Sequence, residues 1–287
     1  MMEISRVGEI TTGWGESAVW DERRQRLWFA DCAAQTLHWL DDPAMVVESW
    51  KLPSMPTGIV PTHDGHLLVV LDDGLYRVDI DAHTSQLVAS FPAELGGRCN
   101  DACADLDGNV ITGKLNLGPA EGSAWRWSAR DGWRLLDPQI TNTNGPAVAV
   151  LDGEMTLIIG DTSQDYFRYP YDAETGTVGA RSVFGSVEGL EGRPDGSALD
   201  TDNGLWCALV GGGLLARFTT HGLDRTVPLP VQFPTDVAFG GPDLDRLYVT
   251  AIGVAGGITA GPAGLDGALL VIDGLGVRGR PEPRCFA

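Results

Sequence analysis

The chain has 287 residues and a formal net charge of −19 at pH 7, with 39 Asp and Glu residues against 20 Lys and Arg residues. It contains no cluster of basic residues, so we expect no nucleic-acid partner, because nucleic-acid binding depends on neutralising phosphates. No segment approaches the roughly 20 apolar residues of a membrane-spanning helix, and the first residues lack the apolar core of a signal peptide. The five cysteines are odd in number and unpatterned. We therefore expect a cytoplasmic protein with reduced thiols and no membrane partner.

A polar residue recurs along the chain, three places before a small or β-branched apolar residue that opens a strand-like segment. In chain order these polar residues are Glu16, Thr57, Asn100, Asn144, Asp195 and Thr235, separated by 41, 43, 44, 51 and 40 residues. A repeat of this length built from short strands is typical of a β-propeller, in which each repeat forms one blade of four antiparallel strands. The sequence therefore predicts an all-β, six-bladed propeller that forms a single domain over residues 1–287.

Each repeat alternates strand-like segments with tight turns. Asp-Gly pairs such as Asp107-Gly108 suit hairpins, because glycine adopts positive φ without a steric penalty. Before the first repeat, residues 6–10 are expected to form a strand that completes the last blade and so removes a sheet edge. The longest step contains the polar stretch 173–179, which predicts an extended outer hairpin or loop in the fourth blade.

Equivalent positions at the start of the innermost strands of a propeller converge on its axis. Four of the six recurring residues, Glu16, Asn100, Asn144 and Asp195, carry carboxylate or amide oxygens. A single Asn or Asp before a strand is ordinarily turn chemistry, but residues that recur in phase line one axial site. Such a site needs a cation, a substrate or water. Oxygen ligands without His or Cys suit one divalent ion, Ca²⁺, Mg²⁺ or Mn²⁺, and Zn²⁺ and Fe²⁺ also accept oxygen.

Other reactive residues form no recognisable site. None of the five histidines pairs with a Ser or Cys in a nucleophile motif, which argues against triad chemistry. The spacing of Cys99 and Cys103 is not that of a zinc site. Trp14 lies two residues before Glu16 and is expected to wall the axial site.

The chain resembles the SMP-30/gluconolactonase/regucalcin family, six-bladed propellers that bind a divalent metal and hydrolyse sugar lactones. The resemblance covers nearly the whole chain and is carried by residues 15–21 (GESAVWD), 98–101 (RCND), 144–145 (NG) with 160–162 (GDT), 194–196 (PDG) and 239–250 (FGGPDLDRLYVT). It implies that Glu16, Asn144 and Asp195 ligate the metal. It also implies that Asp195 is the general base and that Arg98 and Asn100 contact the sugar.

The chain departs from the family pattern at a few positions. Ala18 and Cys99 stand where relatives often have proline, which is loop variation. Residues 113–116 read Gly-Lys-Leu-Asn where relatives commonly show Gly-Thr-Met, and the loop that follows is short. The usual acidic sugar contact is therefore missing from its usual place, and Glu121 and Lys114 are the candidate replacements.

These features predict a metal-dependent hydrolase that opens an aldonolactone to the aldonic acid. The ion would polarise the lactone carbonyl and stabilise the developing oxyanion, and Asp195 would activate water. Two alternatives remain: a phosphotriester or aryl-ester hydrolase that uses the same metal pocket, and a non-catalytic propeller that binds a divalent cation. The in-phase ligands beside Arg98 favour an enzyme, because a scaffold needs no oxygen cage.

Overall fold

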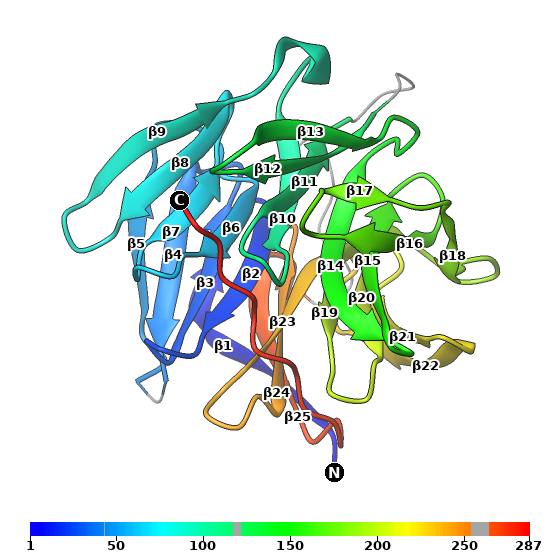
Figure 1. Cartoon of the computed structure of the whole chain (residues 1–287). Helices are drawn as coiled ribbons and strands as arrows, with labels where there is room; N and C mark the ends of the chain where they lie inside the picture. Colours follow the sequence, from blue (N-terminus) through cyan, green and yellow to red (C-terminus); the bar gives the residue numbers. More distant parts are fainter. Residues whose placement is uncertain (43, 117–121, 254–263) are drawn as a thin grey trace.

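The computed structural model describes residues 1–42, 44–116, 122–253 and 264–287, which form six antiparallel sheets around a central axis (Figure 1). The first three blades are β2 (Gly15–Asp21), β3 (Arg26–Asp31), β4 (Thr36–Asp41) and β5 (Val47–Lys51); β6 (Gly58–Pro61), β7 (Leu67–Val70), β8 (Gly74–Asp79) and β9 (Thr84–Ser90); and β10 (Cys99–Ala104), β11 (Val110–Lys114), β12 (Ala124–Ser128) and β13 (Gly132–Asp137). The last three are β14 (Thr143–Leu151), β15 (Glu154–Asp161), β16 (Tyr166–Asp172), β17 (Thr177–Val178) and β18 (Ser182–Gly185); β19 (Arg193–Leu199), β20 (Leu205–Val210), β21 (Leu214–Thr219) and β22 (Gly222–Pro228); and β23 (Pro234–Gly240), β24 (Arg246–Ala251), β25 (Ala268–Asp273) and β1 (Glu3–Thr11). The predicted six-bladed propeller is confirmed.

The described part of the chain has a single short helix, a 3₁₀ turn over Ala93–Leu95. No helix among the described residues is long and apolar enough to cross a membrane.

The N-terminal strand closes the ring, as the sequence predicts. β1 pairs antiparallel with β25 from Glu3↔Asp273 to Thr11↔Ala268, so the first strand of the chain is the outermost strand of the last blade. This pairing covers the edge of β25 and ties the start of the chain to the last blade.

Hydrophobic side chains fill the spaces between neighbouring blades. The middle strand β20 is buried on both faces, with Trp206 and Leu209 fully buried. Trp206 packs edge-to-face against Phe239 of the next blade with ring centroids 6.5 Å apart, a favourable aromatic geometry. Continuous apolar mid-blade strands therefore hold one blade against the next.

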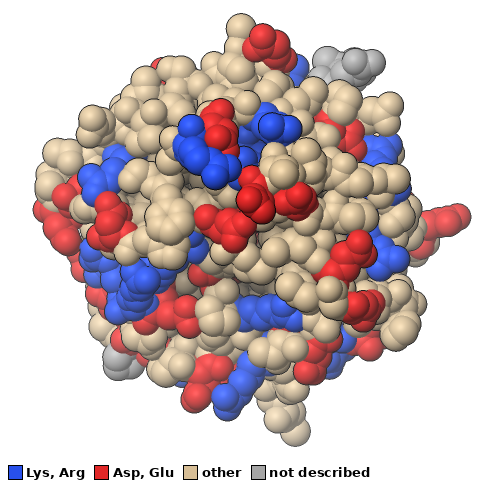
Figure 2. Space-filling model, in the orientation of Figure 1, with Lys and Arg blue, Asp and Glu red and all other residues tan. Residues whose placement is uncertain are grey.

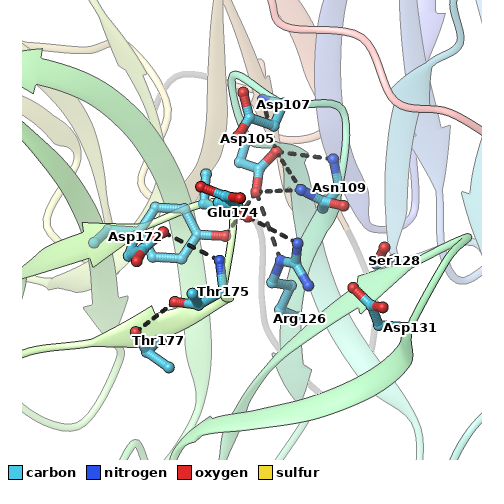
Figure 3. Close-up of polar contacts among 12 residues, drawn as sticks. Asp105, Asp107, Asn109, Arg126, Ser128, Asp131, Asp172, Glu174, Thr175 and Thr177 are labelled. Carbon is cyan, nitrogen blue, oxygen red and sulfur yellow. Dashed lines mark hydrogen bonds and ion pairs between the residues drawn. The ribbon is translucent and has the colours of Figure 1, made fainter.

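Aspartates at the ends of inner strands organise the turns that follow. Asp105 accepts hydrogen bonds from the amides of Asp107 and Asn109 at 3.0 and 2.8 Å, and it lies beside the buried guanidinium of Arg126 (Figure 3). Arg126 also donates to the carbonyl of Ala173 at 2.9 Å. This contact docks the outer hairpin of the fourth blade, predicted from residues 173–179, onto the third blade.

The inner strands are bulged directly after the recurring polar residue. The register shifts between Glu16 and Val19 in β2, and equivalent shifts occur in β10, β14, β19 and β23. A bulge places an extra residue on one strand and re-aims the side chains around it. Ser17 and Asp101 adopt positive φ values of 54° and 26° at these bulges. Two successive residues of these strands therefore approach the axis.

Residues 279–286 near the C-terminus cross the end of the ring at which the inner strands finish. We call this extended segment the C-terminal strap (Figure 1). The amide of Arg280 donates to Leu199 O at the end of β19, and the amide of Cys285 donates to Pro61 O at the end of β6. Figure 2 shows this face, on which basic and acidic side chains are interspersed. We call the mouth where the inner strands begin the upper mouth, and the mouth crossed by the strap the lower mouth.

Removing residues 1–11 should lower the melting temperature by about 10 °C or more, because it uncovers the edge of β25 and opens the ring. Removing only Met1 and Met2, which precede β1, is the matched control and should change little. Circular dichroism melting curves of the two truncations give the comparison. Equal melting temperatures would show that β1 does not close the ring.

Candidate axial site

The four carboxylate and amide residues of the recurring pattern lie on four inner strands at the upper mouth. Glu16 is in β2, Asn100 in β10, Asn144 in β14 and Asp195 in β19, and all four are at most 6% exposed. Asn100 Nδ2 donates to Asn144 Oδ1 at 2.8 Å. The charge of Glu16 acts on Asp195 strongly enough to raise its pKa. The inner strands thus bring these residues to one end of the channel.

Neighbouring side chains fix the orientation of these residues. Trp14 Nε1 donates to Glu16 Oε1 at 3.0 Å, so Trp14 contacts the site as expected. The buried hydroxyl of Tyr166 donates to the Asp195 carbonyl at 2.8 Å and accepts from the Asp195 amide at 3.0 Å. The role of Tyr166 could not be predicted from the sequence, because nothing near Tyr166 in the chain indicates a contact with Asp195 in the next blade.

The two threonines of the recurring pattern act between blades rather than as donors to the axis. Thr57 Oγ1 donates to Cys99 O of the next blade at 2.9 Å. Thr235 Oγ1 likewise donates to Gly15 O of the first blade. These hydroxyls satisfy buried backbone carbonyls where adjacent inner strands meet.

The electrostatics of the channel are dominated by burial and by repulsion between carboxylates. Burial, and then the charge of Asp101, raises the pKa of Glu16 to about 8. Burial, followed by the charges of Glu16 and Asp236, holds the pKa of Asp195 well above its ordinary value. Removing carboxylates from water disfavours their charged form, and nearby like charges add to this effect.

Asp101 and Asp236 are channel residues that the sequence analysis did not assign to the site. Burial raises the pKa of Asp101 to about 6. Burial, followed by the charges of Asp101 and Glu16, raises the pKa of Asp236 well above its ordinary value. The signal was in the sequence, because Asp101 directly follows Asn100 and Asp236 directly follows Thr235.

The donor set at the upper mouth fits a hard divalent cation. Glu16 and Asp195 supply two buried carboxylates, and Asn144 supplies an amide oxygen that already accepts one hydrogen bond. Within the described ranges, no three Asp, Glu, His or Cys side chains stand close enough to hold one ion among themselves. Amide oxygen and water would therefore complete the coordination shell, as is usual for Mg²⁺ and Ca²⁺.

The predicted sugar contacts lie on the loops around this mouth. Arg98 immediately precedes β10, where its Nη1 lies 3.2 Å from Asp72 Oδ1 and 3.0 Å from Met55 Sδ of the second blade. Lys114 ends β11, and its side chain lies over the loop at Gly96 and Gly97. The third candidate, Glu121, lies outside the described residues.

The amide group of Asn100 is restricted in what it can offer a ligand. Its Nδ2 donates to Thr143 O at 2.9 Å as well as to Asn144 Oδ1. Both amide hydrogens are therefore committed. Asn100 can therefore contact a ligand only through its side-chain oxygen, which can accept a hydrogen bond from a hydroxyl or coordinate a cation.

Comparison with known proteins finds relatives that align with most of the chain. The family described as SMP-30/Gluconolactonase/LRE-like region matches residues 14–253. A pentonolactonase of Haloferax volcanii is 31% identical over 291 residues, covering 99% of this chain and 98% of the relative. A 6-deoxy-6-sulfogluconolactonase of Pseudomonas putida is 32% identical over 255 residues, covering 83% of this chain and 82% of the relative.

A solved structure shows the same architecture over almost its full length. The calcium-binding protein regucalcin from Agrobacterium tumefaciens superposes with a TM-score of 0.86 at 26% identity, covering 98% of this chain and 97% of that chain.

Metal-free protein should lose stability as the pH rises from about 4 to about 8. In the unfolded chain Glu16 and Asp101 titrate near pH 4, whereas in the folded chain their pKa values are about 8 and about 6. The folded state therefore holds more protons across this window, and stability falls as those protons are lost. Carboxyls with a lowered pKa, such as Asp64 with a pKa of about 2, affect the stability mainly below this pH range.

Melting curves in EDTA at several pH values measure this effect. Glu16→Gln removes one of the titrating groups and should flatten the decline. A melting temperature that rises from pH 5 to pH 8 in wild-type protein would contradict the proposed crowding of carboxylates.

Proposed function

Because this chain belongs to the SMP-30/gluconolactonase/LRE-like family, we propose that it is a metal-dependent hydrolase that opens a sugar lactone to the corresponding aldonic acid. The observation that carries the proposal is the convergence of two buried carboxylates, Glu16 and Asp195, with two amides, Asn100 and Asn144, at one mouth of the channel. The lactonase names of relatives that align over most of the chain support the substrate class.

Glu16, Asn144 and Asp195 are the residues that would hold the ion. When bound there, a divalent cation supplies Lewis acidity toward the lactone carbonyl and positive charge that keeps the neighbouring carboxylates ionised. Trp14 and Tyr166 hold the side chain of Glu16 and the backbone of Asp195 in place. This fixed arrangement would lower the cost of reorganisation during the reaction.

Asp195 is the proposed proton acceptor. Its carboxylate would take a proton from the attacking water as the water oxygen bonds to the carbonyl carbon. The ring ester C–O bond then breaks, and the departing ring oxygen takes up a proton to become a hydroxyl of the aldonic acid. In the metal-free channel, burial and then the charges of Glu16 and Asp236 hold the pKa of Asp195 well above that of an ordinary carboxyl. A bound cation would counter this effect and keep the carboxylate ionised, as a proton acceptor must be.

Arg98 and Asn100 are the proposed sugar contacts. Asn100 would accept a hydrogen bond from a sugar hydroxyl through its oxygen, since its amide hydrogens are engaged. Arg98 would donate from the rim, held in place by Asp72. Lys114 is a further candidate on the same rim, and Glu121, outside the described residues, is proposed from the sequence alone. Hydroxyl contacts of this kind would favour a sugar lactone over an apolar ester.

Chelation should abolish hydrolysis and also lower the melting temperature, because an ion that binds only the folded state stabilises it by mass action. A pH-stat assay of a panel of aldonolactones, an aryl ester and a phosphotriester, with and without EDTA, measures activity and its restoration by Ca²⁺, Mg²⁺, Mn²⁺ and Zn²⁺. Full lactonase activity in EDTA would refute the metal role. Turnover of only the aryl ester or phosphotriester would refute the lactone assignment, and cation binding without turnover would indicate a non-catalytic propeller.

Asp195→Asn keeps an oxygen toward the ion but removes the base, so it should lower kcat by about 10²–10⁴-fold at saturating metal. Asn100→Ala should mainly raise KM, provided that its sugar contact is equally strong in the ground and transition states. Steady-state kinetics of the two variants at saturating metal separate these roles. A near-wild-type kcat for Asp195→Asn would show that the proton acceptor lies elsewhere.

A further inference from the structure

A small cavity lies on the propeller axis between the upper mouth and the C-terminal strap. It has a volume of about 30 Å³, and a single ordered water needs roughly 10–15 Å³ measured in the same way. It therefore has room for an ion and a water molecule. Ser17, Asp101 and Asp236 are among the inner-strand residues that line it, and Glu282 of the strap lines it from the lower mouth.

These three inner-strand residues occupy equivalent positions, each directly after a residue of the recurring pattern. At the same position the other three blades have Gly58, Gly145 and Gly196. The Asp236 carboxylate occupies the space beside Gly196, where a Cβ would collide with it, and the Asp101 carboxylate accepts a hydrogen bond from the Gly145 amide at 2.7 Å. Gly196 thus leaves space in the narrow channel for the Asp236 carboxylate, and the backbone at Gly145 binds the Asp101 carboxylate.

The two aspartates come from blades on opposite sides of the ring and face a common centre. Asp101 belongs to the third blade and Asp236 to the sixth, and they are 8% and 5% exposed. Each carboxylate accepts a hydrogen bond from the following backbone amide at 2.7 Å. The negative charges of Asp101 and Glu16 also act on Asp236 and disfavour its ionised form. The groups that favour the ionised form of Asp236 are backbone amides.

One ion at the upper mouth leaves this charge uncompensated. Such an ion would be held by Glu16 and Asp195, whereas Asp101, Asp236 and the partly exposed Glu282 lie toward the lower mouth. Buried carboxylates without a counter-charge are strongly unfavourable. A second positive charge in the cavity would remove this cost.

The hydroxyl of Ser17 is an independent indication of a ligand. Ser17 is 4% exposed and lines the cavity, and its Oγ has no hydrogen-bond partner among the described residues. A buried hydroxyl is rarely left without a partner in a folded protein. The sequence retains a serine here at a φ of 54°, although this backbone conformation favours glycine and glycine occupies the equivalent position in three other blades.

We propose that this cavity is a second divalent-cation site, in which Asp101, Asp236 and the Ser17 hydroxyl ligate the ion and Glu282 reaches it through water. No three acidic side chains of the described residues lie close enough together to hold one ion, so water molecules complete its coordination shell. An irregular set of carboxylate, hydroxyl and water oxygens suits Ca²⁺ better than Mg²⁺, which demands near-octahedral geometry. The ion joins opposite blades at the centre of the ring, below the reaction site.

Counting bound Ca²⁺ tests the second site without reference to lactone hydrolysis. Metal-free protein is dialysed against radioactive ⁴⁵Ca²⁺ at neutral pH, and the bound ions per chain are counted. We expect two ions for wild type, one for Asp236→Asn and one for Glu16→Gln, with none for the double variant. Asp107→Asn is the matched control, because it removes an exposed carboxylate outside the channel, and it should keep two.

A variant with both aspartates intact guards against misfolding of Asp236→Asn. Ser17→Gly removes the hydroxymethyl side chain at a backbone position suited to glycine, and it should weaken binding of the second ion by about tenfold or more while leaving the first unchanged. Two results would overturn the proposal: one ion per wild-type chain that Asp236→Asn retains, or a second ion whose affinity is the same in Ser17→Gly. Either would mean that protons, rather than a cation, neutralise the lower carboxylates.

Discussion

The main physical constraint on this structure is that it holds mutually repelling carboxylates close together on the propeller axis. Glu16, Asp101, Asp195 and Asp236 are all buried, and the charges that act on them are those of one another. In water these groups would separate and solvate, but the inner strands fix them around one line. Such an arrangement is stable only with protons or cations in the channel. The folded backbone therefore requires bound protons or cations to neutralise the channel.

The rest of the fold resists this repulsion. β1 closes the ring on β25, and the C-terminal strap ties the ends of β6 and β19 together across the lower mouth. Buried aromatic and aliphatic side chains fill the spaces between blades, and Thr57 and Thr235 bond the inner strands of adjacent blades. Closure, packing and hydrogen bonds all act at blade boundaries. A ring held in this way can keep like charges close without opening.

The same arrangement links the fold to the proposed chemistry. Backbone bulges turn two successive residues of an inner strand toward the axis. The first and third blades each place one polar residue at the proposed reaction site, Glu16 and Asn100, and the next residue at the cavity beneath it. The rim is built from loops between strands, where Arg98 is paired with Asp72 of the neighbouring blade. Rim residues can change without disturbing the residues on the axis.

The sequence by itself determined the number of blades, their boundaries and the four oxygen-bearing residues at the upper mouth, because hydrophobic periodicity and turn chemistry are local and repeat at a constant spacing. It also indicated the N-terminal strand that closes the ring and the outer hairpin of the fourth blade. Only the tertiary structure decided which neighbours share the axis: Asp101 and Asp236 face each other from opposite blades, Tyr166 holds the backbone of Asp195, and the strap brings Glu282 beneath them. These contacts depend on which side chains meet across the axis of the closed ring, and such cross-axis contacts are a long-range property that no local pattern of residues specifies.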